Sequence, residues 1–146
     1  MPSFMEQALV EARAAAQAGE VPIGCVMVRE GAVITRARNA TLAARDPTAH
    51  AEMLAIRAAA AVLGSERLID CDLYVTLEPC PMCAAAISFA RIRRLYYAAA
   101  DPKGGAVENG VRFFASPTCR HRPEIYFGIA EREAAALLQG FFKARR

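Results

Sequence analysis

The residues of this 146-residue sequence whose types and spacing suit metal chemistry lie in two short motifs. The first is His50-Ala-Glu52, and the second is Pro79-Cys80-Pro-Met-Cys83. One imidazole and two thiolates form a donor set that suits zinc. Taken alone, a C-x-x-C pair is equally consistent with a redox pair, and a lone His-x-Glu is a weaker signal still. The two motifs together favour a zinc site.

The number of ligands distinguishes two kinds of zinc site. A structural zinc is usually held by four protein ligands, whereas a catalytic zinc keeps one position for water. His50, Cys80 and Cys83 supply three ligands, so we expect a catalytic site with one zinc ion per chain. Glu52 is two residues from His50 and therefore does not share its helix face. We expect Glu52 to shuttle protons at the water position rather than to bind the metal.

Two other interpretations of these motifs stay open at this point. Cys71 or Cys119 could act as a fourth ligand and make the zinc purely structural, although each is more often a small buried hydrophobe. An oxidised Cys80–Cys83 pair would be redox-active, but it leaves the His-Ala-Glu motif without a role.

Turn and capping signals predict that each motif opens a helix. An Asp-Pro start signal and a following glycine bound an expected helix over Thr48–Leu63. Pro81 suits a first helical position, which makes Cys80 the N-cap of a helix that runs to about Ala90. Because a helix N-terminus is positive, it lowers the pKa of a nearby thiol and favours metal binding.

The other elements follow from apolar spacing, β-branched residues and turn signals. They are a helix capped by Ser3 and ended by Gly19, strands over Val21–Val28, Ala32–Arg36, Leu73–Leu77 and Ile92–Ala98, a short strand near Ile125, and a helix over Ala130–Phe142. A strand, a helix and a strand in succession imply a right-handed parallel crossover. The sequence predicts a three-layer α/β fold, with a mixed central sheet of about five strands, helices on both faces, and one domain over residues 1–146.

Composition excludes several classes of protein. Apolar residues make up 55% of the chain and charged residues 23%, which is typical of a packed domain and not of a disordered one. Apolar runs such as Ala58–Leu63 are too short for a membrane helix. Glu6 and Glu11 interrupt the N-terminal pattern that a secretory signal would need. We therefore expect a cytoplasmic enzyme or binding domain without disulfides or a membrane partner.

Charge is distributed unevenly along the chain. Residues 1–90 hold 7 basic and 10 acidic side chains, a net charge of −3, whereas residues 91–146 hold 11 and 5, a net charge of +6. A basic half suggests a polyanionic partner. A solvated surface with a cationic tail explains the charge alone equally well.

The motifs resemble those of the zinc-dependent nucleoside deaminases of the cytidine-deaminase fold. The similarity is strongest to the bacterial tRNA-specific adenosine deaminases, and it extends over essentially the whole chain. The segments that carry it are Glu20–Gly24, Asp46–Glu52, Arg67–Asp70, Leu73–Ala84, Asp101–Gly105 and Phe141-Phe142.

The resemblance implies hydrolytic deamination of adenosine to inosine at the wobble position of an arginine tRNA anticodon loop, with release of ammonia. It also implies a homodimer. The implied roles are zinc binding by His50, Cys80 and Cys83, proton transfer by Glu52, and substrate binding by Asn39, Ala51, Pro22, Asp101 and Lys103. Without the resemblance, Asn39 would be interpreted as a turn residue.

Two competing functions remain at this stage. A deaminase of a free base or nucleoside, such as guanine or cytosine, would share both motifs. The basic second half, Asp101-Pro-Lys103 and the Phe141-Phe142 ending favour tRNA over it. A non-catalytic zinc module that binds RNA would also need the metal ligands.

Some residues have no assigned role from the sequence. Cys25, where many relatives have alanine, is expected near the pocket wall, and Val107–His121 matches the family less well. Ile87, Phe89 and Ile92 could belong either to a dimer interface or to the core.

Overall fold

The computed structural model describes residues 2–145 and contains a mixed sheet. The five strands are β1 (Gly24–Arg29), β2 (Ala32–Arg38), β3 (Cys71–Leu77), β4 (Arg94–Ala99) and β5 (Glu124–Phe127), in the spatial order β2-β1-β3-β4-β5. Strand β1 is antiparallel to both of its neighbours, whereas β3, β4 and β5 run parallel. The predicted mixed sheet of about five strands is confirmed.

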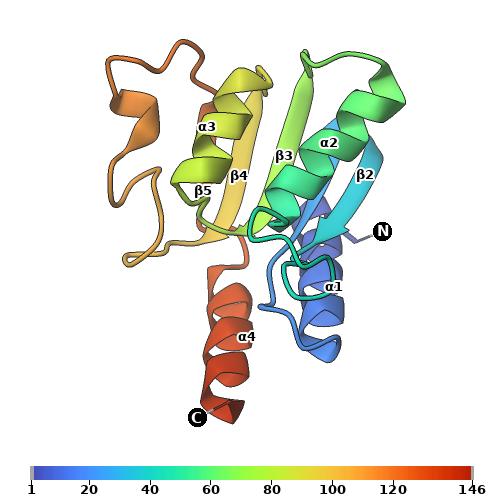
Figure 1. The fold of residues 1–146 in the computed structure, drawn as a ribbon, viewed down its shortest axis with the longest axis vertical. Coiled ribbons are helices and arrows are strands. Elements are labelled where there is room, and N and C mark those ends of the chain that lie inside the picture. Colours follow the sequence, from blue (N-terminus) through green and yellow to red (C-terminus); the bar gives the residue numbers. More distant parts are fainter. Residues whose placement is uncertain (1, 146) are drawn as a thin grey trace.

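Helices cover both faces of this sheet (Figure 1). They are α1 (Phe4–Gln17), α2 (Ala51–Leu63), α3 (Pro81–Phe89) and α4 (Glu131–Ala144). Helices α2 and α3 pack on one face over the larger core cluster, and α1 and α4 pack on the other over a smaller cluster. The three-layer architecture is therefore confirmed. Among the described residues, no helix has both the length and the apolarity to cross a bilayer.

The start of α2 differs from the sequence prediction. Asp46 holds a turn through its side chain, which accepts hydrogen bonds from the backbone N–H and the hydroxyl of Thr48 at 2.8 and 2.7 Å. The helix consequently begins at Ala51, three residues later than predicted, with His50 as its N-cap. This shift leaves the imidazole at the helix entrance. Helix α3, by contrast, begins as predicted, with Pro81 following the N-cap Cys80.

Strand β1 can pack closely against α1 because its first residue is a glycine. A Cβ atom at Gly24 would overlap the backbone of Ala8 and Ala12. We expect Gly24→Ala to lower the free energy of unfolding by about 3 kcal/mol, since neither backbone can move without disturbing the core. Gly140→Ala is the matched control, because nothing lies within 4 Å of a Cβ at this position in α4. Urea denaturation should show the control stabilised by about 0.5–1 kcal/mol, and equal stability of the two variants would contradict this packing.

Candidate active site

The metal-binding motifs converge where α2 and α3 begin. His50 is the N-cap residue of α2, and Cys80 is the N-cap residue of α3. His50 Nδ1 lies 3.6 Å from Cys80 Sγ and 3.5 Å from Cys83 Sγ. All three donor atoms lie within 4.8 Å of one another. The donor atoms of the two motifs thus face a shared point.

These separations fit zinc. With Zn–S bonds of about 2.3 Å and Zn–N bonds of about 2.0–2.1 Å, tetrahedral coordination places sulfur and nitrogen about 3.6 Å apart. The observed nitrogen–sulfur distances of 3.6 and 3.5 Å match this value. The donor set therefore has both the chemistry and the spacing of a zinc site.

Neither of the other two candidate ligands lies at this cluster. The Sγ of Cys71 contacts the carbonyl of Ile69, and the Sγ of Cys119 contacts the carbonyl of His121. Within residues 2–145, the metal-binding group consists of one histidine and two cysteines. The part of the chain that the structure describes therefore brings three protein ligands together, without a fourth.

The two thiols of the cluster differ in acidity. Donation from the Cys83 thiol, together with the backbone N–H groups of Cys83 and Met82, lowers the pKa of Cys80 to about 5 despite its burial. The pKa of Cys83 is raised, because its thiol donates to Cys80 and because it is buried. The start of α3 therefore stabilises one thiolate directly, and a cation is the natural replacement for the second thiol proton.

Glu52 lies in the first turn of α2 beside the cluster and is 4% exposed. Burial raises the pKa of its carboxyl to about 7, and the Cys80 charge adds to this effect, while its own backbone N–H and His50 act in the opposite direction. A carboxyl group with this pKa can take up and release a proton near neutral pH.

Hydrogen bonds join two of the predicted substrate-binding segments to the start of α2. Asn39 follows β2, is 5% exposed, and donates its backbone N–H to the carbonyl of Ile23 at 3.0 Å. Pro22, next to Ile23, is buried. The backbone N–H of Ala40 donates to the carbonyl of Ala49 at 3.0 Å, and Ala49 directly precedes His50. Ala51 itself is fully buried and packs in the larger core cluster.

Asp101 and Lys103 lie in the loop after β4. The Asp101 carboxylate accepts the backbone N–H groups of Lys103 and Gly104 at 3.2 and 3.0 Å and so forms a tight turn. Lys103 is exposed. The backbone N–H of Asp101 donates to Glu78, two residues before Cys80, at 2.9 Å. The loop is thus attached to the segment that carries the metal ligands.

Sequence reasoning missed Glu78. This residue is 2% exposed, and its carboxylate accepts hydrogen bonds from residues of the loop after β4. An acidic residue directly after a buried apolar strand was the available signal, because a buried carboxylate requires partners.

The remaining candidates are structural. Cys25 is fully buried in the core, where burial, Glu52 and Glu11 raise the pKa of its thiol. Phe113 and Phe114 form an edge-to-face pair with ring centroids 5.9 Å apart, and Phe114 belongs to the core. Neither feature is an exposed platform for stacking a base.

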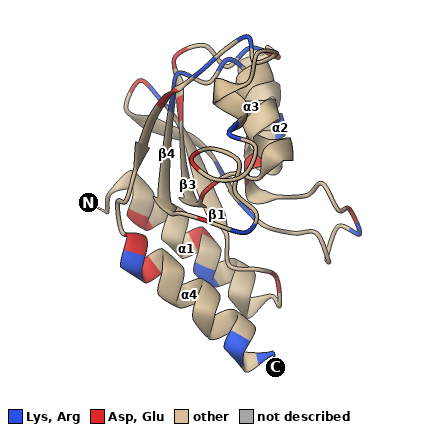
Figure 2. Cartoon of the chain, turned by 90° about the vertical axis from the view of Figure 1, so that its left-hand side faces the viewer, with Lys and Arg blue, Asp and Glu red and all other residues tan. Residues whose placement is uncertain are grey.

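The basic residues of the second half occur on several surfaces. Figure 2 shows Lys and Arg positions in the loops far from α4 and also on α4 itself. Arg93 is paired with Asp72 at 2.9 Å, and Arg94 with Glu124 at 3.3 Å. The net charge of this half is therefore not concentrated on one face.

Comparison with known proteins gives a consistent family. Residues 2–99 match the model of the cytidine and deoxycytidylate deaminase zinc-binding region. The tRNA-specific adenosine deaminase of Agrobacterium fabrum is 64% identical over 143 residues, which cover 98% of this chain and 94% of that protein. The enzyme of the same name from Bacillus subtilis is 41% identical over 143 residues, covering 98% and 89%.

Solved structures give the same result. A structure from studies of A-to-I editing by tRNA:A34 deaminases at the wobble position of transfer RNA superposes with a TM-score of 0.92 at 65% identity, covering 92% of this chain and 98% of that one. Guanine deaminase from Bacillus subtilis superposes less closely, with a TM-score of 0.65 at 33% identity and coverage of 97% and 91%.

Proposed function

This chain belongs to the cytidine and deoxycytidylate deaminase family, among its tRNA-specific adenosine deaminases, and from this we propose that it converts adenosine to inosine at the wobble position of an arginine tRNA, releasing ammonia. The observation that carries the proposal is the three-donor zinc site beside the buried carboxyl of Glu52. It provides one metal position and one proton carrier, which are the two parts that hydrolytic deamination requires.

His50, Cys80 and Cys83 would hold the zinc ion, whose Lewis acidity makes water a nucleophile at neutral pH. Glu52 takes the proton from the attacking water and delivers it to N1 of the adenine ring. Oxygen adds at C6, a second proton passes through Glu52 to the exocyclic nitrogen, and the C6–N bond breaks. Adenosine and water thus become inosine and ammonia. The pKa of about 7 lets the same carboxyl act in both transfers.

The surrounding segments would hold the nucleotide. Asn39 is buried beside the segment that leads into α2, and its amide would bind the purine edge. Pro22 and the buried Ala51 shape the site next to it. Asp101 and Lys103 would contact the RNA beside the target base. An anticodon loop suits this arrangement because its bases are already accessible, which keeps the cost of extruding one small.

A guanine deaminase is the second candidate, because a guanine deaminase shares the fold at 33% identity. Incubation of the protein with an arginine-tRNA anticodon stem-loop, and separately with free adenosine, guanine and cytosine, distinguishes the two. We expect inosine in the RNA and no turnover of the free compounds. Turnover of guanine with unreacted RNA would overturn the proposal.

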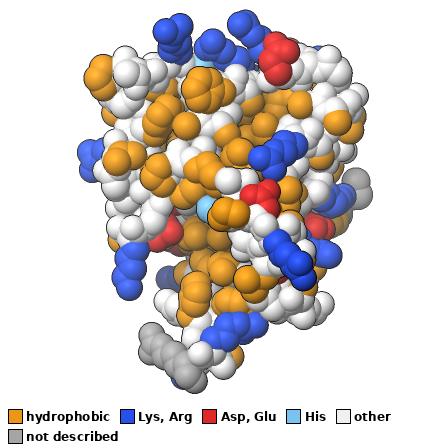
Figure 3. Space-filling view, in the orientation of Figure 1, with side chains coloured by type: hydrophobic (Ala, Val, Ile, Leu, Met, Phe, Trp, Pro, Cys, Tyr) orange, Lys and Arg blue, Asp and Glu red, His pale blue; other side chains and the backbone are white. Residues whose placement is uncertain are grey.

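We also propose that the protein acts as a homodimer in the cytoplasm and that residues 1–146 form one domain. One sheet with a core cluster on each face supports the single domain. Hydrophobic side chains gather over the middle of the α2–α3 face (Figure 3), which supports a second copy packing there. Ile87 and Ile92 are fully buried, whereas Phe89 is 81% exposed, so only Phe89 of the three can contact a partner.

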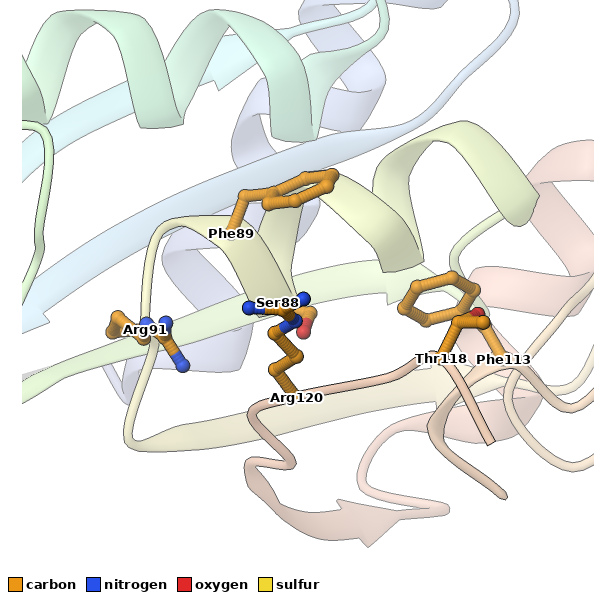
Figure 4. A pocket seen from close by; sticks show the side chains of 6 residues that line it. All are labelled: Ser88, Phe89, Arg91, Phe113, Thr118 and Arg120. Carbon is orange, nitrogen blue, oxygen red and sulfur yellow. The ribbon is translucent and has the colours of Figure 1, made fainter. Parts of the chain in front are cut away.

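Phe89 stands beside a pocket of about 400 Å³ that Arg91, Phe113 and Arg120 also line (Figure 4). We expect Phe89→Asp to convert dimer to monomer in size-exclusion chromatography with light scattering, because a carboxylate in a buried apolar contact is costly. Val10→Asp is the control, since Val10 is 56% exposed on α1, in the opposite layer. A dimer that survives Phe89→Asp would exclude this face.

A further inference from the structure

We infer that Glu78 is a positioning residue that fixes the substrate-side loop, Asp101–Asn109, against the segment carrying the zinc ligands. This inference rests on the proposed function for its kinetic consequence, but its structural part can be tested without any substrate. Glu78 follows β3 directly, and Cys80 comes two residues later. Both the metal site and the loop therefore depend on the same few residues of backbone.

Both oxygens of the Glu78 carboxylate accept hydrogen bonds from the loop. Its Oε1 accepts the backbone N–H of Asp101 at 2.9 Å and the side-chain amide of Asn109 at 2.7 Å. Its Oε2 accepts three consecutive backbone N–H groups, those of Val107, Glu108 and Asn109, at 3.0, 3.0 and 3.1 Å. One buried side chain thus fixes both ends of the loop.

Two further contacts hold the loop on this segment. The carbonyl of Pro79, between Glu78 and Cys80, accepts the backbone N–H of Ala106 at 2.8 Å. A Cβ atom at Gly105 would overlap the Glu78 carboxylate, so the loop backbone lies directly on this group. The turn formed by Asp101 consequently has a fixed position relative to the metal site.

Glu78→Gln is a selective test of this role. A glutamine keeps the shape and one acceptor oxygen, which can serve the three N–H groups of Val107–Asn109. Its amide nitrogen then faces the backbone N–H of Asp101 and the side-chain amide of Asn109. The Asn109 amide can turn its oxygen toward this nitrogen, but the N–H of Asp101 cannot bond to it, because both are donors. The variant therefore detaches the Asp101 end of the loop, whereas an alanine would remove every acceptor and endanger folding.

We expect Glu78→Gln to raise KM for the anticodon stem-loop about tenfold, because one buried hydrogen bond is lost. The variant should change kcat less than threefold and retain one zinc per chain. Amide hydrogen exchange at Asp101 should accelerate at least about tenfold for the same reason. Asp72→Asn is the matched control, because Asp72 is a buried carboxylate at the opposite end of β3, bonded by Arg93 at 3.0 and 2.9 Å. This control should leave KM and the exchange of Asp101 unchanged.

Unchanged exchange at Asp101 in Glu78→Gln would overturn the inference, whatever substrate the enzyme uses. An equal rise in KM in Asp72→Asn would also overturn it, since the effect would then be a general loss of stability. Activity of the wild-type protein on guanine alone would refute the proposed substrate while leaving the exchange result as the test of Glu78.

Discussion

Replacing Glu52 with glutamine should lower kcat for the anticodon stem-loop by about 10³-fold or more while leaving one zinc ion per chain. Glutamine has the same shape but cannot carry a proton, and general acid–base catalysis of this kind contributes about 10²–10⁴-fold. Zinc should remain because Glu52 is not a member of the three-ligand cluster. The measurements are single-turnover inosine formation and elemental analysis of the purified variant.

Glu66→Gln is the control for this experiment. Glu66 is exposed in the segment after α2, so the same change of charge there should leave kcat unaltered. Activity of Glu52→Gln close to that of the wild type would show that another group moves the proton. RNA binding by the inactive variant would in addition separate an enzyme from a zinc module that only binds RNA.

Removing one metal ligand should abolish both zinc content and turnover. His50→Ala leaves Cys80 and Cys83 as the only described donors, and two ligands hold zinc far more weakly than three. Because zinc binds the folded state, the variant should also unfold at a lower temperature than the zinc-loaded wild type. Elemental analysis and a thermal melt measure the two effects.

His121→Ala is the matched control, because His121 is the other histidine of the chain. Its Nε2 lies 2.7 Å from the carbonyl of Ile92. His121 is not a member of the metal-binding group. Its loss should cost about 1 kcal/mol of stability and no zinc. Full zinc occupancy in His50→Ala would contradict the ligand assignment.

The elements that hold the metal ligands could be predicted because their signals are local. Ser3 and Glu6 form the expected capping box of α1. Pro81 is the first residue of α3 and follows the N-cap Cys80, as expected for a proline. The predicted start of α2 is three residues too early, because the Asp-Pro-Thr signal forms a separate turn before the helix. Such a turn and a helix start share the same residue preferences.

The Glu78 network could not be predicted for a different reason. Its carboxylate binds residues that lie 23 to 31 positions later in the chain, and four of the five donors are backbone N–H groups. Every non-proline residue offers such a donor, so the sequence carries no mark of which ones are used. The sequence alone therefore assigns no role to the loop from Val107 onward.

The sequence also does not determine which side of α3 faces solvent. Nearly every residue of Pro81–Phe89 is apolar or small, so helical spacing does not distinguish a core face from an exposed one. The structure buries Ile87 and leaves Phe89 at the surface. Only the position of the neighbouring sheet decides between them.

X-ray absorption at the zinc edge of the purified protein tests the central claim most directly. A metal held by His50, Cys80 and Cys83, with one position left to solvent, should show two sulfur scatterers at about 2.3 Å and two nitrogen or oxygen scatterers at about 2.0–2.1 Å. Three or four sulfur scatterers would mean that another cysteine closes the site, and the catalytic account would then be wrong.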